Sequence, residues 1–219
     1  MEKREKLYHR LNFFFVLFYL SVSIILAAYY ASSGQSYYST LGICGPLLLL
    51  LPTVLERIMG FRPAYQLHFL IYLFSFFAYV VGLVMQAYQY TPYYDKIIHA
   101  LSGVLGMSVG VLLFYALKPG RTVQKSDFPL VAVFSFSVSM TVACLWEIGE
   151  YLVGQFFPCD PQRVLTTGVA DTMQDIIVCL FGSLFFIPSL VRYYRQEKST
   201  LLMGGLLAFF EKNLTNREP

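Results

Sequence analysis

The feature that most constrains this chain is a series of six apolar runs, each close to the thickness of a lipid bilayer. A helix needs about 20 apolar residues to cross the hydrocarbon core of a membrane. Charged residues make up only 13% of the chain, whereas a soluble domain carries about 25%. The sequence therefore predicts an all-α fold, a polytopic bundle of transmembrane helices.

The six spans are expected to form a single transmembrane domain over residues 1–219. The second run contains Pro46 and Pro52, so we expect that span to be kinked. The last apolar stretch, residues 201–210, is too short to cross a bilayer and predicts a short C-terminal interfacial helix. The predicted spans are residues 11–31, 41–59, 67–88, 95–117, 129–156 and 172–191.

The distribution of basic residues predicts the orientation of these spans. Fourteen of the 16 lysine and arginine residues lie in the two tails, in the loop after the second span, and in the loop after the fourth. Loops rich in lysine and arginine stay in the cytoplasm. We therefore expect both termini to be cytoplasmic, which leaves only Lys96 and Arg163 on the outer side.

Two carboxylates stand out in the fifth span, because Glu147 and Glu150 are the only charged residues between Pro129 and Phe157. Residues three apart share one face of a helix. An ionised side chain within the hydrocarbon costs about 2.5–3.5 kcal/mol on insertion scales. We therefore expect both glutamates to face the interior of the bundle, with Trp146 packed beside them.

The two neighbouring spans each begin with a polar pair four residues apart, and each pair occupies one helix face. Given the predicted orientation, His99, Glu150 and Asp175 lie within about two or three turns of the outer interface. We therefore expect three helices to contribute to one cluster. Its predicted members are Asp95, His99, Glu147, Glu150, Asp171 and Asp175.

This cluster predicts a divalent-metal site, since carboxylates with one imidazole suit Mg²⁺, Mn²⁺ or Zn²⁺. The predicted ligands are His99, Glu147, Glu150 and Asp175. In the supporting roles, Asp95 orients His99 and Asp171 caps its helix. Lys96 is the only adjacent cation, and the acidic charge must be offset by protons, a divalent cation or Arg163. A bound cation would polarise a phosphoryl group or activate water, so a metal-dependent enzyme acting on a lipid or cell-envelope precursor is one hypothesis.

Two other functions stay open at this point. Intramembrane carboxylates also serve small proton- or ion-coupled transporters. Because the six spans show no internal repeat, a homodimer would have to supply the second half of such a carrier. The third possibility is a non-catalytic protein whose polar cluster sets helix packing. No nucleophile–base motif indicates a reaction, and no basic patch on a soluble face indicates nucleic-acid binding.

Three short motifs occur in order along the chain: Tyr94-Asp95-Lys96-Ile97-Ile98-His99, Trp146-Glu147-Ile148-Gly149-Glu150, and Gly168-Val169-Ala170-Asp171-Thr172-Met173-Gln174-Asp175 with Gly182. Together they resemble the YjdF-like family of bacterial integral membrane proteins, over roughly residues 65–195. The opening of the fourth span is more distantly similar to VanZ-like proteins. The resemblance implies a plasma (inner) membrane protein that faces the cell envelope, and it implies no particular activity or catalytic residues.

Overall fold

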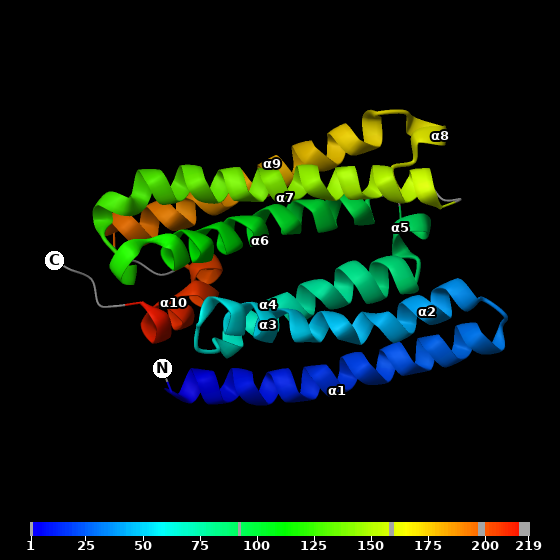
Figure 1. Ribbon diagram of the computed structural model, residues 1–219, viewed down its shortest axis with the longest axis horizontal. Helices are drawn as coiled ribbons and strands as arrows, with labels where there is room; N and C mark the ends of the chain where they lie inside the picture. The colour runs from blue at the N-terminus through cyan, green and yellow to red at the C-terminus, as the bar shows by residue number, and fades with distance from the viewer. Residues whose placement is uncertain (1, 92, 158–159, 197–199, 215–219) are drawn as a thin grey trace. The chain divides into compact units, whose positions relative to one another are not determined.

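The computed structural model describes residues 2–91, 93–157, 160–196 and 200–214, and these form helices joined by short loops (Figure 1). Six helices are long and apolar enough to cross a membrane, as predicted. They cover Lys3–Ser32, Ser36–Met59, Tyr65–Val84, Tyr94–Leu117, Lys125–Phe156 and Ala170–Gln196. Two of the basic residues counted in the C-terminal tail, Lys198 and Arg217, lie outside the described ranges.

The contacts between residues divide the chain into two compact units. One unit comprises Met1–Tyr94 together with Gly204–Leu214, and is here called the N-terminal unit. The other comprises Asp95–Met203, and is here called the central unit. The first three spans belong to the N-terminal unit, and the last three belong to the central unit.

The first two spans of the N-terminal unit are α1 (Glu2–Ser32) and a segmented helix that follows it. The second span consists of α2 (Ser36–Cys44), a 3₁₀ segment, η1 (Gly45–Leu50), and α3 (Leu51–Met59). Pro46 and Pro52 each stand in the first turn of a new segment, because proline cannot donate the backbone hydrogen bond that a continuous α-helix requires. The chain therefore changes helix type at both prolines.

The third span combines α4 (Tyr65–Ser75) with a π-helical segment, η2 (Phe76–Val84). Tyr88 and Tyr94 donate hydrogen bonds of 2.9 and 2.8 Å to the carbonyls of Ala78 and Phe77. These hydroxyls satisfy acceptors within the wide π-helical turn. The span ends at Val84, four residues before the predicted end, because the chain turns at Gln86, where φ is 63°. The short helix α5 (Ala87–Tyr90) follows.

The C-terminal helix predicted near residues 201–210 is present as α10 (Leu201–Asn213). Phe209 is 2% exposed and packs edge-on against Phe61, with ring centroids 4.7 Å apart. Asn213 accepts a 2.6 Å hydrogen bond from the Arg62 amide and donates one of 3.0 Å to the Arg62 carbonyl. Lys212 pairs with Glu5. Residues 204–214 are thereby held within the N-terminal unit.

The central unit is built on α6 (Tyr94–Leu117), α7 (Phe128–Phe156) and α9 (Ala170–Gln196), with a short helix, α8 (Val164–Thr167), before α9. Small residues bring these helices close together. A Cβ added at Gly182 would lie 1.9 Å from the Ala100 carbonyl oxygen, and one added at Gly103 would lie 2.2 Å from that of Cys179. Ser139 of α7 donates to the Gly103 carbonyl at 3.1 Å. The three spans therefore meet along a backbone-to-backbone interface.

A second set of polar contacts holds the end of the central unit where α6 finishes and α7 begins. Lys118 lies 2.7 and 2.8 Å from the two carboxylate oxygens of Asp127. The Tyr115 hydroxyl contacts Asp127 at 3.2 Å and the Tyr194 hydroxyl at 2.6 Å. These contacts tie α6, α7 and α9 together at this end.

Candidate functional site

The candidate site begins at the first turns of α6 and α9, where Lys96 lies among three aspartates. The Lys96 ammonium is 2.7 Å from Oδ1 of Asp171 and 2.8 and 2.9 Å from the two carboxylate oxygens of Asp175. It is also 3.3 Å from Oδ2 of Asp95. Asp95 and Asp171 stand in first turns, where a carboxylate complements the positive end of the helix dipole. One lysine therefore joins the beginnings of two helices.

His99 lies on the next turn of α6 and faces the same carboxylates. Its Nε2 atom is 3.5 Å from Oδ1 of Asp95 and 3.9 Å from Oδ1 of Asp175. One ligand atom from each of Asp95, His99 and Asp175 lies within 4.8 Å of the other two. Bonds of about 2.0–2.2 Å to one metal ion hold ligand atoms about 3–4 Å apart, so metal binding would draw these three atoms slightly inward.

Charge in this group is only partly balanced. The three aspartates and Lys96 together carry a net charge of −2 when His99 is neutral. Most of these side chains are shielded from solvent, with Asp175 only 2% exposed and Lys96 16% exposed. A buried charge that has no counter-ion is costly. The group can therefore accept further positive charge.

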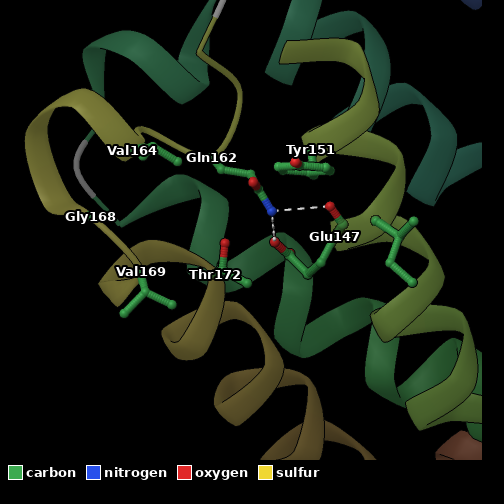
Figure 2. Close-up of a pocket in the computed structure, with 8 residues that line it drawn as sticks. Glu147, Tyr151, Gln162, Val164, Gly168, Val169 and Thr172 are labelled. Carbon is green, nitrogen blue, oxygen red and sulfur yellow. Dashed lines mark hydrogen bonds between the residues drawn. The ribbon is translucent and has the colours of Figure 1, made fainter. Parts of the chain in front are cut away.

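Glu147 lies on α7 beside a cavity, and its two carboxylate oxygens differ. The Gln162 amide donates to the Glu147 carbonyl at 3.0 Å and to Oε2 at 3.3 Å, as Figure 2 shows. Oε1 has no hydrogen-bond partner among the residues that the structure describes. Glu147 is only 5% exposed. A buried carboxylate oxygen without a donor is costly, so this position can receive a ligand that donates a hydrogen bond.

The cavity has a volume of about 360 Å³. Residues of α7, of the 162–169 segment and of the start of α9 line it (Figure 2). Its walls combine apolar side chains with four polar groups. The lining residues are Glu147, Ile148, Tyr151, Gln162, Val164, Gly168, Val169 and Thr172.

Glu150 has a different environment from Glu147. The Trp146 indole N–H donates a 3.0 Å hydrogen bond to Oε1 of Glu150, and the Trp146 side chain is largely exposed. Glu150 is partly buried and does not line the cavity.

The structure thus brings together some of the predicted residues and separates others. His99 and Asp175 lie with Asp95, and Asp171 joins them through Lys96. Glu147 and Glu150 are not members of the group of ligand atoms around His99. The only indication in the sequence that Lys96 belongs to the site was its position beside the acidic residues. No feature of the sequence indicated that Gln162 contacts Glu147.

A family model described as "Predicted membrane protein (DUF2238)" matches residues 13–196. This match confirms the resemblance to the YjdF-like membrane proteins, and it gives no support to VanZ-like proteins. No curated protein matches, and no solved structure matches.

Proposed function

The chain belongs to the DUF2238 family of predicted membrane proteins, and we propose that it is a membrane enzyme acting through a divalent cation bound by Asp95, His99 and Asp175. The observation that carries the proposal is the convergence of their three ligand atoms within 4.8 Å. Two carboxylates and an imidazole form a donor set that suits Mn²⁺ or Zn²⁺, and Mg²⁺ through the oxygens.

Charge supports the same proposal. A divalent cation would neutralise the net charge of −2 that the three aspartates and Lys96 carry. Lys96 would then act as a positioning residue, since its ammonium holds Asp171 and Asp175 in place. Such an internal counter-ion lowers the cost of keeping the acids together before a cation arrives.

In this proposal the cation polarises a phosphoryl group or lowers the pKa of a bound water. The substrate is a lipid or an envelope precursor that reaches the site from the bilayer. The site opens on the outer face of a plasma membrane, with both termini in the cytoplasm, as the distribution of basic residues favours.

Metal content tests the proposal directly. Purified full-length protein would be equilibrated with Mg²⁺, Mn²⁺ or Zn²⁺, desalted and analysed by plasma mass spectrometry, and we expect about one ion per chain. His99→Ala and Asp175→Asn should abolish retention. Asp160→Asn is the matched control, because Asp160 caps α8 through the amides of Val164 and Leu165 and lies outside the group.

Variants of Glu147 and Glu150 test whether the ligand set extends beyond Asp95, His99 and Asp175. Glu147→Gln and Glu150→Gln are expected to retain the ion, because neither residue belongs to the group around His99. Loss of metal in either variant would restore the wider ligand set predicted from the sequence. A wild-type chain that holds no metal under any of these conditions contradicts the proposal.

A structural role for the same cluster is the second candidate, and the contacts of Lys96 favour it. Lys96 binds Asp171 and Asp175 more closely than a typical surface ion pair, and so fastens α6 to α9. If packing were the whole function, the Asp175→Asn variant would lose stability, and wild-type protein would bind no metal. Unfolding and metal analysis on the same preparations separate the two candidates.

A further inference from the structure

The cavity beside Glu147 is separate from the group around His99 and has its own chemistry. Among its lining residues, Glu147 is the only one that carries a charge, and there is no lysine or arginine. Lys96, which lies outside this lining, is engaged by Asp171 and Asp175. The cavity therefore presents one carboxylate with no cation of its own.

The hydrogen bonds of Glu147 point to a ligand that donates. Gln162 satisfies Oε2 and the backbone carbonyl, whereas Oε1 has no partner among the described residues. Thr172 and Tyr151 add hydroxyl groups to the lining (Figure 2). A protonated amine would neutralise the carboxylate and also supply a charge-assisted hydrogen bond. An alcohol would supply only the hydrogen bond.

The rest of the cavity suits an alkyl chain. Ile148 and Val164 form part of its wall and are about half exposed, and Val169 is 71% exposed. Leu165, next to this rim, is 88% exposed. Exposed apolar surface of this kind suits contact with lipid. An amphiphile could therefore place its polar head at Glu147 while its tail stays in the bilayer.

We propose that this cavity binds the primary ammonium head of an amphiphile, with the Glu147 carboxylate as its counter-ion. The volume of about 360 Å³ accommodates such a head with the first carbons of its tail. A metal ion fits less well, because the lining offers one carboxylate whereas hard cations take about six oxygen ligands. This proposal does not depend on the cation proposed for Asp95, His99 and Asp175.

The test uses soluble probes with the same six-carbon tail. Hexylammonium, hexyltrimethylammonium and hexanol would be titrated by calorimetry into full-length protein in lipid nanodiscs, with a chelator present so that metal binding plays no part. We expect hexylammonium to bind at least about tenfold more tightly than the other two probes, because only it combines a charge with N–H donors.

Two glutamine variants form a matched pair for this experiment. Glu147→Gln should weaken hexylammonium binding about tenfold or more, because it removes the counter-ion. Glu150→Gln removes the same charge three residues away, outside the cavity, and should leave the affinity within about twofold. Val169→Trp provides a second, independent test. A bulky side chain at this exposed rim position should block the entry of hexylammonium into the cavity while Glu147 stays intact.

Each other result overturns the proposal. Equal binding of hexanol and hexylammonium would make the cavity merely apolar, and equal losses in the two glutamine variants would indicate diffuse surface charge. Binding that survives Val169→Trp would locate the ligand elsewhere, and no binding of hexylammonium to wild type would refute the site outright. Thermal unfolding of each variant without probe confirms that its fold is retained.

Discussion

At the scale of single residues, Lys96 is the most consequential side chain of the central unit. Its ammonium contacts carboxylates from both α6 and α9, and its side chain is only 16% exposed. Without it, three shielded aspartates would repel one another. Both candidate functions depend on this residue, since it holds the acids either for a cation or for packing alone.

Replacing Lys96 by methionine should therefore destabilise the protein. Removing one partner of a buried ion pair costs about 3–5 kcal/mol, because the other charge is left uncompensated. Lys3→Met is the control, since it removes the same charge from an exposed position and should change stability by no more than about 0.5 kcal/mol. Denaturant unfolding in detergent micelles measures both, and similar small changes in the two variants would contradict a central role for Lys96.

At the scale of elements, the close approach of α6 to α9 depends on glycine. The Ala100 carbonyl occupies the space that a side chain at Gly182 would need. Gly149, on α7, has no atom within 4 Å of the position where its Cβ would lie. Two glycines of the central unit thus differ in what they do, although both stand within helices.

Alanine at these two positions should accordingly have opposite effects. Gly182→Ala forces the backbones apart and should cost about 1–3 kcal/mol or more. Gly149→Ala should be neutral or stabilising by up to about 1 kcal/mol, because alanine is the better helix former. Thermal unfolding of the two variants side by side provides the measurement. A tolerated Gly182→Ala would mean that the helices pack less closely than described.

The six spans could be predicted from the sequence because long apolar runs are compatible with few folds other than transmembrane helices. The beginnings of the fourth and sixth spans could be predicted because Asp95, His99, Asp171 and Asp175 lie near the ends of apolar runs. The π-helical segment Phe76–Val84 did not follow, since an almost wholly apolar run has no periodicity that distinguishes one helix type from another.

The site was predicted in outline only. Glu147 and Glu150 share a face, yet a spacing of three residues leaves them about 60° apart around the helix, and one is buried while the other is partly exposed. The position of Gln162 depends on the path of an irregular loop, which local pattern does not encode. The same holds for the direction that the flexible Lys96 side chain takes.

At the scale of the whole molecule, the strong asymmetry of basic residues predicts how the chain crosses the membrane. Ser33 lies in the loop after the first span, Ser126 lies at the beginning of the fifth span, and both residues are exposed. The predicted orientation places Ser33 outside the cell and Ser126 on the cytoplasmic side.

Cysteine labelling in whole cells checks this orientation. In a background lacking Cys44, Cys144, Cys159 and Cys179, a membrane-impermeant maleimide should modify Ser33→Cys in intact cells. It should modify Ser126→Cys only after permeabilisation. The reverse pattern would invert the topology and move the candidate site to the cytoplasmic face. Cys159 lies outside the described residues, and it is replaced so that it cannot react with the maleimide.

The position of α10 in the N-terminal unit has a consequence for the order of events during synthesis. The first three spans leave the ribosome long before α10, and the three spans of the central unit are made in between. Phe61 and Arg62 can form their contacts with Phe209 and Asn213 only after α10 has been synthesised. The N-terminal unit therefore gains the contacts of its closing helix only after the three spans of the central unit have been synthesised.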